Sequence, residues 1–194
     1  MSGPARISRF PVPEVADLPE DLRERILAVQ EKSGFVPNVF LALAHRPAQL
    51  RLFMDYHDEL MNADEPLTKA EREMIVVATS AERDCLYCVV AHGAILRIRA
   101  KDPLVADYLA TSYRQADLTD RQRAMLDYCV LLSVRPEDVD DADRDALRAA
   151  GWSDDAVWDM SAITAFFSMS NRLAHAFGIM PNPEFHLMGR GPKG

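Results

Sequence analysis

Two copies of one helix-start signal restrict the fold of this chain more than any other feature. Residues 67–74 read Leu-Thr-Lys-Ala-Glu-Arg-Glu-Met, and residues 118–125 read Leu-Thr-Asp-Arg-Gln-Arg-Ala-Met. In each segment a Thr precedes a Glu or Gln by three positions, which is the spacing of a capping box at the start of a helix. Because the Leu-Thr pair, one Arg and the Met recur in register, we predict an internal duplication of a helical unit.

Signals for helices continue along the rest of the chain. Apolar residues recur at helical spacing between Pro, Gly, Asp and Ser residues that typically start or stop helices. Ala and Leu far outnumber Val, Ile and Thr, and the 8 Gly are too few for the turns of an all-β chain. We therefore predict an all-α, multi-helix bundle, with helices over residues 21–32, 39–44, 47–61, 69–81, 85–99, 103–113, 120–132, 140–150 and 154–177.

The length and charge of the chain limit its organisation and its partners. A chain of 194 residues suits one domain. We predict a proline-rich arm over residues 1–18, a single helical domain over residues 19–181 and a tail over residues 182–194. The net charge of −8 and the lack of a basic block argue against a surface that binds nucleic acid.

Cysteine usage and hydropathy favour the cytoplasm. The sequence shows neither a signal-peptide stretch near its start nor the run of ~18 apolar residues that a membrane span needs. Its 3 Cys are fewer than a secreted disulfide scaffold of this size carries. We therefore expect a soluble cytoplasmic protein, and we interpret the closely spaced Cys85 and Cys88 as redox-active or metal-binding.

Cys85, Cys88 and His92 form the constellation most typical of chemistry. On a helix they are three and four residues apart, so the three side chains share one face. Two thiols one turn apart can close a reversible disulfide, and the first turn of a helix favours a thiolate. His92 can take a proton from Cys88 or stabilise its anion, which makes a nucleophile with an adjacent base. Tyr87 and Glu82, beside the pair, are candidate supporting residues.

Three other interpretations of the cysteine pair stay open. The two thiols and the imidazole could be ligands of a structural zinc ion, although the sequence has no second cysteine pair. The two cysteines could be inert, because free Cys also packs as a small hydrophobic residue. The pair could also belong to a non-catalytic redox sensor or an oligomeric scaffold whose contacts change when a disulfide forms. The spacing favours redox chemistry.

Glu73 is the second candidate. Its predicted helix places it beside apolar residues at the edge of the buried stripe, where a carboxyl group can exchange protons near neutral pH. The alternative is that Glu71, Arg72 and Glu73 form a solvated first turn whose negative charges suit the helix dipole. Taken alone, these residues favour the solvated turn.

The residues that carry this chemistry resemble a known family. The run from Glu73 through Cys85-Leu86-Tyr87-Cys88 to His92 is similar to the alkylhydroperoxidase D-like branch of the carboxymuconolactone decarboxylase superfamily. The likeness includes a glutamate twelve residues before the first cysteine and a histidine four residues after the second. It extends over about residues 34–178. Residues 35–38 (Phe-Val-Pro-Asn) and 181–185 (Pro-Asn-Pro-Glu-Phe) resemble the subset called peroxidase-related proteins.

The resemblance implies an all-helical fold, assembly into dimers, trimers or hexamers, and reduction of hydroperoxides by the dithiol. It implies that Cys88 attacks the peroxide and that Cys85 closes the disulfide. His92 and Glu73 would then form the proton relay. The resemblance also implies an external dithiol reductant, either lipoyl-type or thioredoxin-like, and we expect no cofactor and no metal. Tyr87 is a departure, because the best-known hydroperoxidases carry a second histidine at this position.

The remaining candidates are expected to be structural. Cys129 lies among apolar residues and is predicted to be a core thiol. The other histidines lack a cysteine or carboxylate at ligand spacing, and His57 is expected on the surface. Apolar residues from Trp158 to Phe177 recur at helical spacing, so this stripe is predicted to serve the core or a subunit contact.

Overall fold

The computed structural model describes residues 6–191, and within that range the chain forms helices and loops without strands. Short 3-10 turns occur at Val15–Asp17, Tyr113–Gln115, Pro136–Asp138 and Pro183–His186. The all-α prediction is therefore confirmed. The α-helices of the described residues are α1 (Glu20–Ser33), α2 (Asn38–Leu43), α3 (Pro47–Asn62), α4 (Lys69–Ala81), α5 (Leu86–Ala100), α6 (Val105–Ser112), α7 (Asp120–Val134), α8 (Asp141–Ala149) and α9 (Asp154–Phe177).

The helices begin where the sequence carries start signals. The Thr68 hydroxyl accepts a hydrogen bond from the Glu71 amide at 3.2 Å, and the Glu71 carboxylate accepts one from the Thr68 amide at 2.9 Å. Thr119 and Gln122 make the same reciprocal pair at the start of α7. Both predicted capping boxes are confirmed, and each satisfies backbone N–H groups that have no partner inside the helix.

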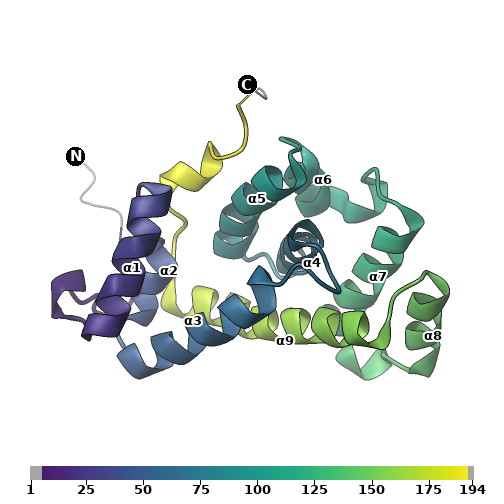
Figure 1. The fold of residues 1–194 in the computed structure, drawn as a ribbon, viewed down its shortest axis with the longest axis horizontal. Coiled ribbons are helices and arrows are strands. Elements are labelled where there is room, and N and C mark those ends of the chain that lie inside the picture. The colour runs from purple at the N-terminus through teal and green to yellow at the C-terminus, as the bar shows by residue number, and fades with distance from the viewer. Residues whose placement is uncertain (1–5, 192–194) are drawn as a thin grey trace.

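Helix α4 lies at the centre of the bundle. It packs against α5, α6, α7 and α9, which surround it in Figure 1. The prediction that the first turn of α4 is solvated is wrong, because Glu71, Arg72 and Glu73 are only 9%, 0% and 1% exposed. Neighbouring helices cover α4 on all sides, so its charged residues are buried and need polar partners in the interior.

Helix α9 runs along one side of the bundle and buries one face (Figure 1). Phe166 and Phe167 are 4% and 1% exposed, whereas Trp158 and Met169 are 77% and 45% exposed. The predicted stripe therefore divides in two. Phe166 and Phe167 belong to the core. Trp158 and Met169 point outward, and for these two residues a subunit contact stays a prediction.

Segments from both ends of the described chain lie against the bundle. The Arg9 amide donates a hydrogen bond to the Phe177 carbonyl at 2.6 Å. Phe185 packs edge-on against Phe35, with 4.9 Å between the ring centroids. The division into arm, domain and tail stays a prediction, and the first five and last three residues of the chain lie outside the described range.

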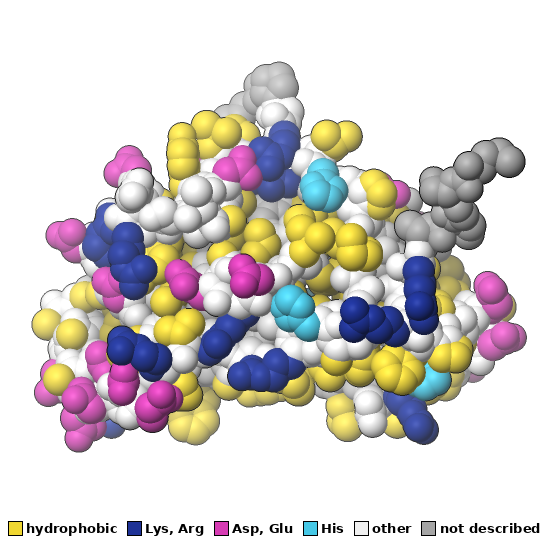
Figure 2. Space-filling view, turned by 180° about the vertical axis from the view of Figure 1, so that it is seen from behind, with side chains coloured by type: hydrophobic (Ala, Val, Ile, Leu, Met, Phe, Trp, Pro, Cys, Tyr) yellow, Lys and Arg dark blue, Asp and Glu magenta, His cyan; other side chains and the backbone are white. Residues whose placement is uncertain are grey.

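Charged side chains cover much of the surface. Figure 2 shows acidic and basic side chains interspersed over the back of the molecule, with acidic ones gathered at the end where α8 lies. This helix corresponds to the acidic segment at residues 140–150 of the sequence. Of the helices that the structure describes, none is both long and apolar enough to cross a membrane.

Candidate active site

The turn between α4 and α5 sets the position of the paired cysteines. Asp84 adopts a left-handed backbone with a φ of 52°, and the Cys85 amide donates a hydrogen bond to the Ser80 carbonyl at 3.0 Å. Cys85 is therefore the N-cap residue of α5, and Cys88 lies in the first turn. Both thiols are at the amino end of a helix, where the helix dipole favours a thiolate.

The two thiols differ in acidity although they are neighbours. Each cysteine is free and only 1% exposed. A hydrogen bond between the two side chains lowers the pKa of Cys85 to about 7. The same interaction, together with burial, raises the pKa of Cys88 well above its usual value. The pair therefore begins to lose a proton near neutral pH, and the resulting charge lies mainly on Cys85, where the Cys88 S–H stabilises it.

Polar side chains from α4 and α9 surround the Cys88 sulfur. The Ser170 hydroxyl oxygen lies 3.9 Å from this sulfur, and the Ser80 hydroxyl donates to the Asn171 amide oxygen at 3.0 Å. The hydrogen bond with Ser170 acts to lower the pKa of Cys88, against the larger effects of Cys85 and burial. Sequence analysis misses both serines, because isolated serines in two distant helices form no motif.

Glu73 and His92 form a buried pair between α4 and α5. His92 Nδ1 lies 2.7 Å from Glu73 Oε2, and Arg99 Nη1 lies 3.0 Å from the other carboxylate oxygen. Because Nδ1 is turned toward the Glu73 carboxylate, Nε2 is the ring nitrogen left for other partners. Sequence analysis does not single out Arg99, although its place two turns after His92 on one helix face is a signal for it.

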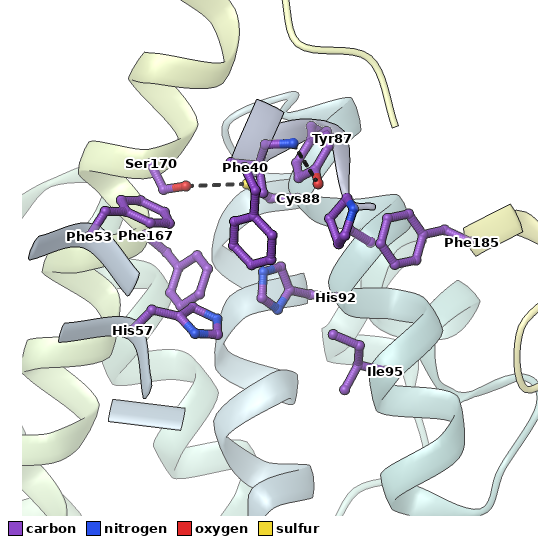
Figure 3. A pocket seen from close by; sticks show the side chains of 13 residues that line it. Phe40, Phe53, His57, Tyr87, Cys88, His92, Ile95, Phe167, Ser170 and Phe185 are labelled. Carbon is purple, nitrogen blue, oxygen red and sulfur yellow. Dashed lines mark hydrogen bonds between the residues drawn. The ribbon is translucent and has the colours of Figure 1, made fainter. Parts of the chain in front are cut away.

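Cys88 and His92 face the same pocket, which Figure 3 shows from close by. The pocket has a volume of about 100 Å³. Among the described residues Cys88 lines it and Cys85 does not, so a bound molecule meets the Cys88 sulfur. The lining is mainly apolar and aromatic and consists of Pro37, Val39, Phe40, Phe53, His57, Tyr87, Cys88, Ala91, His92, Ile95, Phe167, Ser170 and Phe185.

His57 remains partly exposed, as expected, but it also lines this pocket, which the sequence does not indicate. Its ring centroid is 6.1 Å from that of His92. Helix α3 packs against α4 and α9 and thereby turns this histidine inward. No sequence motif could have found His57, because its partners lie on other helices.

The two predicted supporting residues lie in different surroundings. Tyr87 is 4% exposed, and its hydroxyl accepts a hydrogen bond from the Val39 amide at 3.2 Å, which ties α5 to α2. Burial raises the pKa of Tyr87, so its hydroxyl stays protonated. Glu82 is exposed at the end of α4 and is not part of the pocket lining.

Cys129 lies in α7, away from the paired cysteines. It is 0% exposed and belongs to the main hydrophobic core. Burial raises its pKa to about 12. The predicted core thiol is therefore confirmed.

The donor geometry does not fit the zinc interpretation. In the part of the chain that the structure describes, no group of three or more His, Cys, Asp or Glu side chains is placed to hold a metal ion. His92 is turned toward Glu73 instead of joining Cys85 and Cys88 around one point. The three predicted donors therefore do not make a metal centre.

Known proteins resemble the chain in both sequence and structure. Residues 47–104, which include Glu73, both paired cysteines and His92, match the carboxymuconolactone decarboxylase family. An uncharacterized peroxidase-related protein from Ralstonia eutropha JMP134, described as an alkylhydroperoxidase AhpD core, is 60% identical, with a TM-score of 0.96 over 98% of this chain and 100% of that chain. A peroxidase-related protein from Silicibacter sp. TM1040 is 39% identical, with a TM-score of 0.91 over 98% of this chain and 100% of that chain.

A more distant structure shares the fold alone. The debrominase Bmp8 is 19% identical, with a TM-score of 0.75 over 96% of this chain and 97% of that chain. No curated protein matches the chain. Since identity of 60% extends over nearly the whole length, the chain belongs to the carboxymuconolactone decarboxylase family, among its AhpD-like peroxidase-related proteins.

Proposed function

We propose that this protein is a thiol-dependent peroxidase that reduces hydroperoxides with its paired cysteines. One observation carries the proposal: the Cys88 sulfur and the His92 ring, which is hydrogen-bonded to Glu73, face one apolar pocket. The relatives described as peroxidase-related proteins support the reaction class.

In the first step Cys88 attacks the distal oxygen of the hydroperoxide. An S–O bond forms and the O–O bond breaks, so the sulfur is oxidised to a sulfenic acid and the peroxide is reduced to an alcohol or water. Cys88 must lose its proton for this attack. The hydrogen bond between the sulfurs lets that proton pass to the Cys85 thiolate, so the higher pKa of Cys88 does not prevent its role.

His92 and Glu73 serve the reaction through the pocket. Among the described residues the His92 ring is hydrogen-bonded to Glu73 and to neither sulfur. His92 therefore exchanges protons with the reacting atoms through a water or the bound peroxide. Glu73 holds the ring by Nδ1 and leaves Nε2 free for this exchange.

In the second step the Cys85 sulfur attacks the sulfenic acid on Cys88. An S–S bond forms, and the hydroxyl group leaves as water after it gains a proton. An external dithiol, lipoyl-type or thioredoxin-like, then attacks the Cys88 sulfur from the pocket side. Cys85 is the better leaving group because its pKa is lower, and a second exchange releases the reduced pair.

We further propose that the protein works in the cytoplasm as a homo-oligomer. A cycle that returns to free thiols needs a reducing compartment. The side chains of Trp158 and Leu52 are 77% and 70% exposed, which supports a subunit contact that covers them. Size-exclusion chromatography with light scattering tests the assembly, and a monomer at all concentrations contradicts it.

Two cysteine variants test the reaction. Cys88→Ser is expected to abolish peroxide consumption in the presence of dihydrolipoamide, because the attacking sulfur is lost. Cys85→Ser is expected to leave a sulfenic acid on Cys88, which a dimedone probe labels and mass spectrometry locates. Equal and unaffected turnover in both variants rejects the proposal. Wild-type protein that oxidises once and never turns over is a redox sensor instead.

A further inference from the structure

We propose that His57 is the proton donor for the oxygen that leaves when the peroxide bond breaks. This inference rests on the proposed peroxidase function. His57 comes from α3, outside the cysteine motif, and its ring lies across the pocket from His92 (Figure 3). The ring centroids are 6.1 Å apart and both rings line the pocket, so a peroxide bound there can contact both histidines.

The other titratable side chains of the pocket already have partners within the protein. Tyr87, Cys88 and His92 are each hydrogen-bonded to a neighbouring group. His57 is held from its outer side, where its Nδ1 lies 3.3 Å from Asp58 Oδ1. Its second nitrogen, Nε2, is therefore the one left for a molecule in the pocket.

The chemistry of an alkyl hydroperoxide calls for a proton donor on this wall. As Cys88 attacks the distal oxygen, the electron pair of the O–O bond moves to the other oxygen and makes a strongly basic alkoxide. In this proposal His57 acts as an imidazolium: its Nδ1–H is held by Asp58, and its Nε2 proton passes to the alkoxide, so that the alcohol leaves and a neutral imidazole remains. The His57 side chain is 26% exposed, so water can restore its proton.

The surroundings of His57 hold its ring in place for this role. The Phe53 ring is stacked with it at an interplanar angle of 15°, and the Phe167 ring meets it edge-on at 6.2 Å between centroids. The hydrogen bond with His57 lowers the pKa of Asp58 to about 2, so Asp58 is an anion at neutral pH. Arg25 of α1 anchors Asp58 at 2.6 Å. A positioned imidazole is a more effective acid than a mobile one.

Two oxidants of similar size but different leaving groups test this role. Cumene hydroperoxide releases an alkoxide that needs a proton, whereas perbenzoic acid releases a carboxylate that leaves without one. His57→Gln is expected to slow dithiol oxidation by cumene hydroperoxide about 10²-fold and oxidation by perbenzoic acid by less than about 3-fold. The rates are measured by quenching with acid and counting free thiols. Asp58→Asn is expected to give a smaller loss with the same selectivity, and His186→Gln, on the surface, is the matched control without effect.

The outcomes separate this inference from the proposed function. Wild-type protein whose dithiol resists both oxidants rejects the peroxidase proposal itself. Wild-type protein that reacts normally, while His57→Gln loses nothing or loses equally with both oxidants, rejects only the role of His57. An equal loss with both oxidants is the sign of a purely structural residue. A loss confined to cumene hydroperoxide supports the inference.

Discussion

Helices α4 and α7 begin with the same capping signal, but only α4 contributes a side chain to the candidate active site. Each starts with a Thr-led capping box, and each has an Arg four residues after that Thr. Arg72 donates to the Leu60 carbonyl in the last turn of α3 and to the Ala63 and Glu65 carbonyls in the loop that follows. Arg123 likewise donates to the Arg114 and Ala116 carbonyls in the segment before α7. The repeated signal thus fastens a loop to a helix in both units.

The next position distinguishes the two units. Glu73 in α4 corresponds in register to Ala124 in α7. The central place of α4 buries Glu73 between His92 and Arg99, whereas α7 lies further out and has the plain side chain there. The capping box is therefore a local feature of the helix start, and it is compatible with either a carboxylate or a methyl group at this position. The carboxylate becomes useful only where a second helix supplies its partners.

The cysteines show the same contrast. A neighbouring thiol lowers the pKa of Cys85 to about 7, whereas burial among apolar side chains raises that of Cys129 to about 12. Both side chains are fully buried, so burial alone does not decide the reactivity of a thiol. Polar neighbours at a helix start decide it.

The largest effect on turnover is expected from replacing the reactive thiol, with the core thiol as the comparison. Cys88→Ser is expected to lower peroxide turnover by at least ~10³-fold, whereas Cys129→Ser is expected to retain most of it, because only Cys88 lines the pocket. Turnover is measured by peroxide consumption with an excess of dithiol. Loss of turnover in Cys129→Ser, with the fold intact by circular dichroism, would mean that the second unit takes part in the chemistry.

The two arginines are expected to differ in their contribution to stability. Arg72 is 0% exposed and also donates to Asp159 at 2.8 Å. Arg72→Met leaves buried carbonyls and this carboxylate without a partner, so the free energy of unfolding is expected to fall by about 3 kcal/mol. Arg123→Met, at the half-buried counterpart, is expected to cost about 1 kcal/mol. Equilibrium unfolding in urea measures both, and equal losses contradict the central place given to α4.

A pair of neighbouring glutamates sharpens the comparison within α4. Glu73→Gln is expected to slow dithiol oxidation about 50-fold, because the amide no longer fixes the proton on His92 Nδ1 and leaves Arg99 without its anion. Glu71→Gln keeps a side chain that can complete the capping box and is expected to retain full activity. Rapid-quench thiol counting measures both. Equal activity in the two variants would remove Glu73 from the relay.

The acidity of the thiols can be titrated directly. Thiolate absorbance at 240 nm is expected to rise with a midpoint of about pH 7 in the reduced wild-type protein. The step is expected to disappear in Cys85→Ser and to persist in Cys129→Ala. A wild-type protein without any step below pH 8 contradicts the coupled pair.

The smallest expected effect is on stability at alkaline pH. The pKa of Cys129 is about 12 in the folded chain and about 8.5 in an unfolded one. Above about pH 8.5 the unfolded chain therefore loses this proton first, and stability falls as the pH rises toward 12. Cys129→Ala removes this loss of stability, which is about 1.4 kcal/mol at pH 9.5. Urea unfolding at pH 7.5 and 9.5 measures it, and an unchanged pH dependence contradicts the raised pKa.

Local features of the fold could be predicted from the sequence. The helices, both Thr-led capping boxes and the placement of Cys85 and Cys88 at the start of α5 follow from spacing and start signals that act within a few residues. Such signals need no knowledge of the rest of the chain, because capping hydrogen bonds and side-chain periodicity are local.

The site could be predicted only in part. The run around Cys85, Cys88 and His92 is visible in the sequence, since one helix carries all three. The helix of Glu73 favours a solvated turn, which is wrong, and nothing around His57 indicates that it reaches the pocket, because the partners of both residues lie on other helices.

The sequence by itself determined the helices, their caps and the one-turn spacing of the two thiols, because these depend on residues close together in the chain. The tertiary structure decided which charged residues are buried, which sulfur faces the pocket and which histidines meet there. Burial and pocket geometry depend on contacts between α3, α4, α5 and α9. A carboxylate or an imidazole changes its role when those helices remove water and supply a partner.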